Sequence, residues 1–149
     1  MERMHSIDAI LTSGNTLYSN ALDIKQTQDV IEIRKTGRDI GNQYDFSRLD
    51  QTRFATALSE IARNVINYAT QGCCLFSLVE YDSKLYLIAQ IKDQGPGITD
   101  VEQALIDGFS TSQGLGLGLP GARRLVHLFE VESCAGNTEI SLAISRIQR

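Results

Sequence analysis

The sequence predicts an α+β fold, a two-layer sandwich in which helices cover one face of a mixed, largely antiparallel sheet. Three observations indicate it. Two segments with helical periodicity, at 29–43 and 49–69, are followed by a strand hairpin, and a helix with a further hairpin closes the chain. Hairpins build antiparallel sheets, and each helix has one apolar stripe, so the two kinds of element can bury those surfaces against each other.

The first part of the chain predicts an edge hairpin and then a helix. Residues 5–11 and 17–24 are expected to be strands joined by a turn at Ser13-Gly14-Asn15. Residues 29–43 are expected to be helical, although Gly37 weakens the helix. The apolar positions of that helix are Val30, Ile33 and Ile40.

Residues 49–69 give the clearest helical pattern of the chain. Apolar residues recur at steps of three and four and mark the side that faces the core: Phe54, Leu58, Ile61, Val65 and Tyr68. At roughly 100° per residue, Glu60, Asn64 and Asn67 share a neighbouring stripe. This spacing places a carboxylate and two amides on the shoulder of a buried helix, where they can face a cleft.

The second half predicts two hairpins with helices between them. Residues 73–81 and 85–92 are β-rich and flank the turn Asp82-Ser83-Lys84. A short helix is expected at 101–106. A longer helix is expected at 120–129, with Pro120 in its first turn. Residues 131–134 and 138–147 form the last expected hairpin, through Ala135-Gly136-Asn137.

Length and composition predict that the 149 residues form one cytoplasmic domain. The chain is 42% hydrophobic, with a net charge of -4 and a pI near 5.1, which argues against a nucleic-acid surface. No apolar run approaches the ~20 residues of a membrane span, and the amino end does not resemble a signal peptide. Three cysteines, two of them adjacent, fit a reducing compartment.

Asp93-Gln-Gly95-Pro-Gly97-Ile98 follows the second strand of the first hairpin. Glycines let the backbone approach a flat ligand closely, and a carboxylate there can accept a hydrogen bond from the exocyclic amine of adenine. A plain turn between a strand and a helix is the alternative interpretation of the same residues.

Gly114-Leu-Gly116-Leu-Gly118 runs into the helix that begins near Pro120. Alternating glycines expose N–H groups that can surround an anion at a helix N-terminus. A dinucleotide fingerprint and a Walker loop are both excluded, since no βαβ unit and no Gly-Lys-Ser/Thr occur. Residues 107–112 extend the loop into a mobile lid anchored by Phe109, and an unliganded glycine loop is the alternative.

Glu60 and Asn64 lie one helical turn apart. An amide oxygen can bind Mg²⁺, which depends on substrate phosphates for other ligands. The carboxylate can then accept a proton from a hydroxyl that attacks the γ-phosphate. A solvated pair on a helix edge is the alternative, but the combination of adenine, phosphate and metal elements favours an ATP site.

These motifs resemble those of the GHKL superfamily of gyrase, Hsp90, histidine kinases and MutL, whose nucleotide site is the Bergerat fold. The resemblance implies Glu60 as the base, Asn64 as the Mg²⁺ ligand and Asp93 as the adenine contact. Thr138, in Gly136-Asn-Thr138, would meet the adenine edge through water. The residues expected to bind nucleotide are Asn64, Asn67, Asp93, Gly95, Gly97, Ile98, Ser110, Thr111, Gly114, Leu115, Gly116, Leu117, Gly118, Leu119 and Thr138.

The segments 57–64, 93–98 and 107–121 are similar to those of the RsbT-type switch serine kinases, and residues 1–15 have no counterpart in them. That resemblance implies ATP- and Mg²⁺-dependent phosphorylation of a serine on a STAS-domain stressosome protein. On release, such kinases activate a PP2C-type phosphatase. Two alternatives remain open: an anti-sigma factor or other nucleotide-gated binding module without turnover, and a plain ATPase in which Glu60 activates water.

Overall fold

The computed structural model describes residues 6–69, 71–93, 118–134 and 137–148, and the side chains of all of these except Gly118 and Cys134. Its elements, in chain order, are α1 (Ile7–Ser13), β1 (Asn15–Ile24), α2 (Thr27–Gln43), α3 (Arg48–Tyr68), β2 (Gly72–Tyr81), β3 (Lys84–Asp93), α5 (Gly118–Leu125), β4 (Leu128–Cys134) and β5 (Asn137–Ile147). The five strands form one sheet in the order β1-β2-β3-β5-β4, and every neighbouring pair is antiparallel.

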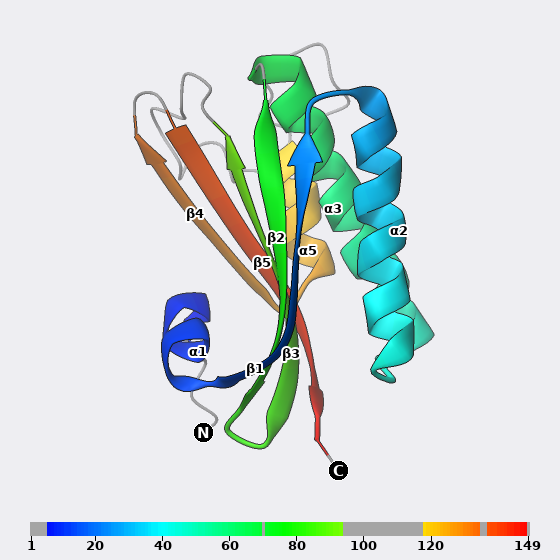
Figure 1. Ribbon diagram of the computed structural model, residues 1–149, viewed down its shortest axis with the longest axis vertical. Helices are drawn as coiled ribbons and strands as arrows, with labels where there is room; N and C mark the ends of the chain where they lie inside the picture. Colours follow the sequence, from blue (N-terminus) through cyan, green and yellow to red (C-terminus); the bar gives the residue numbers. More distant parts are fainter. Residues whose placement is uncertain (1–5, 70, 94–117, 135–136, 149) are drawn as a thin grey trace.

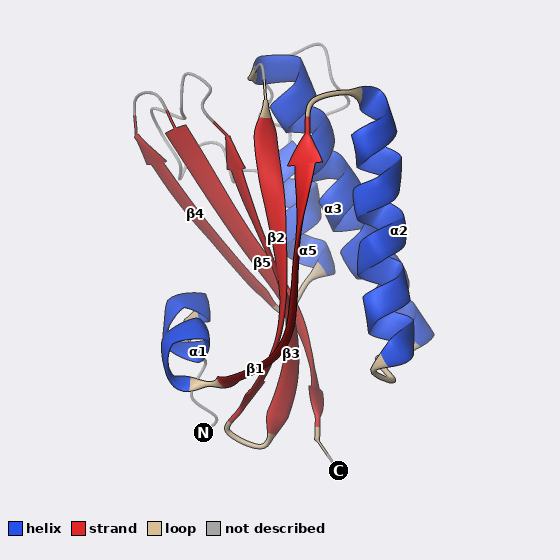
Figure 2. Ribbon diagram, viewed as in Figure 1, coloured by secondary structure: helices blue, strands red, loops and turns tan. Residues whose placement is uncertain are grey.

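Figures 1 and 2 show α2, α3 and α5 together on one face of this sheet and α1 on the other. The predicted α+β sandwich is confirmed, and the main core lies between the sheet and the three helices. Its largest members include Phe54 of α3 and Phe76 of β2, whose rings meet edge to face with centroids 6.5 Å apart. We call the sheet side that carries this core the helix-facing side and the opposite side the outer side.

The two central helices match the periodicity of the sequence. Four of the five residues of the α3 stripe are buried, and only Tyr68, at the helix end, is 42% exposed. Gly37, which weakens α2 locally, lies against Leu58 and Phe54 of α3. A Cβ at Gly37 would lie 2.5 Å from Leu58 Cδ1. The glycine therefore allows the two helices to pack tightly.

The expected hairpin at the amino end is wrong in its first half. Residues 17–24 lie in edge strand β1, but residues 7–13 form helix α1 instead of a strand. Ser6 caps this helix by accepting a hydrogen bond from the N–H of Ala9. Ile7 and Ile10, three residues apart, are fully buried against the outer side of the sheet. Burial of these two residues against the sheet favours the helix, although the turn signal at Gly14 predicts a strand there.

The expected helix at 120–129 is also wrong at its end. Helix α5 stops at Leu125, and β4 begins at Leu128. The N–H of His127 donates to the carbonyl oxygen of Ala143, and Leu128 and Phe129 then pair with β5. These two residues satisfy their backbone groups in the sheet, which a continued helix would not allow. The expected helix at 101–106 lies outside the described residues.

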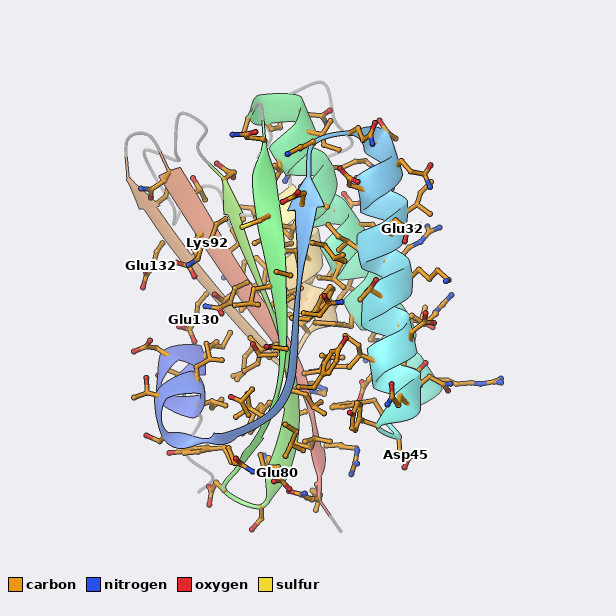
Figure 3. The ribbon with its side chains drawn as sticks, in the orientation of Figure 1. Glu32, Asp45, Glu80, Lys92, Glu130 and Glu132 are labelled. Carbon is orange, nitrogen blue, oxygen red and sulfur yellow. The ribbon has the colours of Figure 1, made fainter. Side chains whose placement is uncertain are left out.

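Glu80 lies at the end of the sheet that is far from Asp93 (Figure 3). Hydrogen bonds from the side chains of Gln148 and Asn15 hold its carboxylate. These bonds lower the pKa of Glu80 below its ordinary value of 4.5, with the bond from Gln148 as the larger cause.

Candidate nucleotide site

The turn of the β2–β3 hairpin determines which residues meet at the other end of the sheet. Asp82 and Ser83 have positive φ angles of 52° and 64°, as a two-residue hairpin loop requires. The resulting register places Gly72 opposite Asp93. Strand β5 pairs with the other edge of β3 and places Thr138 opposite Asp93.

Asp93 and Thr138 both lie on the helix-facing side of the sheet. They follow the alternation of the buried residues Ile91 and Ile140, which precede and follow them on the same face. Thr138 is 5% exposed, and its Oγ1 lies 2.9 Å from Oγ of Ser133 on β4. The hydroxyl of Thr138 is therefore held in place, and the half-buried carboxyl of Asp93 stands beside it.

A pocket of about 630 Å³ opens at these strand ends. Its lining joins Asp93 and Thr138 to residues at or next to the ends of β1, β2, β3 and β5: Asp23, Lys25, Gln71, Gly72, Cys73, Lys92, Asn137 and Glu139. The volume lies in the range of small-molecule sites. On the outer side, where Figure 3 shows Lys92 lying away from α2 and α3, two exposed ion pairs border the pocket. They join Lys25 to Asp23 at 3.8 Å and Lys92 to Glu139 at 3.9 Å.

Helix α3 packs against this end of the sheet at Gly72 of β2. A Cβ there would lie 2.5 Å from the carbonyl oxygen of Lys92, 2.9 Å from Cγ1 of Val65 and 3.4 Å from Cβ of Asp93. The glycine thus lets three elements close on one another. Val65 directly follows Asn64, so the polar stripe of α3 ends next to the strand that carries Asp93.

On α3, Glu60 and Asn64 are half-buried and Asn67 is exposed. The Glu60 carboxylate accepts a hydrogen bond from Nη1 of Arg63 at 3.0 Å, and its side chain keeps 27% exposure. It is therefore both anchored and reachable from solvent. Among the residues that line the pocket in the described part of the chain, none comes from α3.

The phosphate end of the predicted site is described only in part. Gly118 is the first residue of α5, and the side chain of Leu119 packs in the main core. The remaining predicted residues lie outside the described part of the chain: Gly95, Gly97, Ile98, Ser110, Thr111, Gly114, Leu115, Gly116 and Leu117. The described residues hold no group of three or more His, Cys, Asp or Glu side chains able to bind a metal.

Sequence reasoning missed the lysine, cysteine and acidic residues that border the pocket. The hairpin register predicts them in part: the turn at Asp82-Ser83 pairs Cys73 with Lys92, one step from Gly72 and Asp93. Strand alternation then puts Cys73 and Lys92 on the outer side.

Among the described residues no helix is long and apolar enough to cross a membrane.

Comparison with known proteins agrees with the fold and shows the family. Residues 49–146 match the family of histidine kinase-, DNA gyrase B-, and HSP90-like ATPases (HATPase_c), and the chain belongs to this family. Family membership implies that the chain binds ATP.

Within that family, the chain is similar to the serine/threonine-protein kinase RsbT of Bacillus subtilis (strain 168). The two are 44% identical over 113 residues, which is 75% of this chain and 85% of RsbT. The chain is therefore a serine/threonine-protein kinase of the RsbT type.

Solved structures agree with the fold. The RsbU and RsbW domains of Rv1364c from Mycobacterium tuberculosis match 87% of this chain, with a TM-score of 0.59 and 20% identity. This chain spans only 34% of that longer protein. The mycobacterial sensor histidine kinase MprB matches 89% of this chain and 100% of its own, with a TM-score of 0.54 and 18% identity.

Proposed function

We propose that this chain is a cytoplasmic, ATP- and Mg²⁺-dependent kinase that phosphorylates a serine on a STAS-domain partner of the stressosome type. On release from that partner it would activate a PP2C-type phosphatase, so that phosphorylation acts as a switch. The observation that carries the proposal is the pairing of Asp93 with Thr138 in a strand-end pocket, in a chain related to RsbT over most of its length.

Adenine recognition is assigned to the strand ends. The carboxylate of Asp93 would accept a hydrogen bond from the exocyclic amine, and the hydroxyl of Thr138 would meet the ring edge through water. Three features support this: the common face of the two side chains, the burial of Thr138, and the contact that orients its hydroxyl against Ser133. The contact with Ser133 uses one hydrogen-bonding position of the hydroxyl, and the positions that remain can meet a polar ligand edge through water.

Proton transfer is assigned to Glu60. As the serine oxygen bonds to the γ-phosphorus and the bond to the departing ADP breaks, the Glu60 carboxylate would accept the hydroxyl proton. Arg63 would hold that carboxylate on its side of α3 through the 3.0 Å contact. Mg²⁺, when bound through Asn64 and the phosphates, would supply charge stabilisation to the transferring group.

The experiment is intact-mass spectrometry of a STAS-domain protein after incubation with this chain, Mg²⁺ and ATP. The wild-type chain should add one phosphate to the STAS-domain protein. The Glu60→Ala variant should bind ATP but transfer no phosphate to that protein. Glu32→Ala is the matched control, because Glu32 lies exposed on α2 (Figure 3), and it should transfer as wild type does. Transfer by Glu60→Ala at the wild-type rate would remove Glu60 from the role of base. Bound ATP without transfer by wild type would favour a nucleotide-gated binding module.

A further inference from the structure

The two edges of the sheet differ in a way that bears on self-association. At one edge, β4 is seven residues long and carries Glu130 and Glu132. At the other, β1 is ten residues long and has no charged residue from Asn15 to Leu22. Short length and charged residues protect sheet edges from pairing with other chains. By that criterion β4 is protected and β1 is not.

β1 is exposed along most of its length. Within the described residues its one strand neighbour is β2, and Figure 1 shows it at the margin of the sheet with α2 on one side and α1 on the other. Leu17 and Tyr18 are 46% and 38% exposed, and both belong to this strand. A long, exposed edge strand with no charge over eight residues is a template for an added strand.

We propose that β1 pairs antiparallel with β1 of a second copy of this chain, across a two-fold axis at Asn20. In this register Tyr18 of each copy lies opposite Leu22 of the other, and Ser19 lies opposite Ala21. Tyr18 and Leu22 are on the helix-facing side, since they pair with the core residues Leu78 and Cys74 of β2. The joint would therefore extend the main core from one copy into the next. Aromatic and aliphatic pairs of this kind stabilise neighbouring strands.

The strand is self-complementary about this axis, which favours a second copy over another occupant. The register of β1 with β2 shifts at Leu17, which has no partner residue on β2, and the first charged residue after it is Asp23. With Asn20 at the centre, Leu17 of one copy falls opposite Asp23 of the other. The paired segment thus ends at a Leu17–Asp23 pair on each side of the axis, and no charged residue lies opposite a residue of like charge.

The pairing connects the dimer to the pocket without blocking it. Asp23 lines the pocket, so Leu17 of the second copy would lie next to the pocket border. Because the strands run in opposite directions, the two pockets would lie at opposite ends of a ten-stranded sheet. Both would remain open to nucleotide and to an acceptor protein.

The test is analytical ultracentrifugation of the full chain over a wide concentration range. The short paired segment predicts a weak, concentration-dependent dimer. Ser19→Glu with Ala21→Glu puts two like-charge pairs across the axis and should weaken the dimer by about tenfold or more. Ser19→Lys with Ala21→Glu puts opposite charges at the same two places and should retain it. Both residues are exposed, so thermal melting should show that each variant is folded.

Three results would overturn the proposal. A wild-type chain that is monomeric throughout the range would exclude the dimer. A dimer that both double variants leave unchanged would place the interface on another surface. Equal weakening by the two variants would exclude this register, because only the charge sign across the axis distinguishes them.

Discussion

Gly72→Ala tests whether the contact between α3 and the strand ends controls both stability and nucleotide binding. The new Cβ would lie 2.5 Å from the Lys92 carbonyl oxygen, whereas ordinary contact begins at 3.4 Å, so the two must separate by 3.4 − 2.5 = 0.9 Å. The carbonyl is backbone in the sheet and cannot rotate away. The methyl group also meets Val65 Cγ1 at 2.9 Å, on the other side.

Overpacking of this kind costs about 1–3 kcal/mol. The alanine recovers roughly 0.4–1 kcal/mol by restricting the unfolded chain. We therefore expect the free energy of unfolding to fall by about 1–2 kcal/mol, which lowers Tm by about 2–4 °C per kcal/mol in a domain of this size. Since relief of the contact moves the backbone that carries Asp93, ATP affinity should fall by about tenfold or more.

The assay is thermal melting together with calorimetric titration of ATP. Gly41→Ala is the control, because the atoms nearest to its Cβ would belong to the side chain of Gln51 on α3, the closest at 3.0 Å, and not to the backbone of the site. It should keep wild-type ATP affinity and change stability by less than about 1 kcal/mol. The reasoning is refuted if Gly72→Ala melts and binds as wild type does. A destabilised Gly72→Ala with unchanged affinity would refute the link to the site.

Further predictions concern the core, the thiols and pH. Phe54→Ala should lower the free energy of unfolding by about 3–5 kcal/mol in urea titrations, because it leaves a cavity in the main core. In a Cys134→Ser background, Ellman's reagent should label exposed Cys73 rapidly in the folded protein, and ATP should slow that labelling since Cys73 lines the pocket. Cys74 should react only on unfolding, because burial raises the pKa of its thiol far above the usual range; rapid labelling of both would contradict this. The pKa of Glu80 is lowered in the folded state, so its stabilising effect is present above 4.5 and is lost as pH falls through the folded pKa. The stability difference between wild type and Glu80→Gln should therefore shrink in acid, and a constant difference would show that the carboxylate charge is not responsible.

The sequence predicts the central elements closely because local signals and burial agree there. The expected helix at 49–69 is observed at Arg48–Tyr68, and the strands expected at 73–81 and 85–92 are observed at Gly72–Tyr81 and Lys84–Asp93. The two errors arise where tertiary contacts decide. Seven residues of α1 have too little periodicity to outweigh a turn signal beside them, and β4 takes over the last residues of an apparent helix by pairing with β5.

Some features of the candidate site could likewise be predicted from the sequence, and others depend on tertiary contacts. Gly72 could be predicted to lie opposite Asp93, because the register of a hairpin follows from its turn. The pairing of Asp93 with Thr138 could not be predicted in this way, since no turn joins β3 to β5 and their register is a tertiary property. The role of Gly72 could not, since it depends on how closely α3 approaches the sheet, which periodicity does not specify. The border of Lys25, Lys92 and Cys73 comes from three strands whose order is a tertiary property.

The most direct test of the central claim, that Asp93 at the end of β3 binds ATP, is a calorimetric titration of ATP into wild type and Asp93→Asn. Asp45→Asn is the matched control. Asp45 lies at the far end of the helix layer (Figure 3), and its positive φ of 63° is tolerated by asparagine. The account predicts wild-type affinity for Asp45→Asn and a loss of about tenfold or more for Asp93→Asn, the cost of one charged hydrogen bond. Equal affinity in wild type and Asp93→Asn would contradict it.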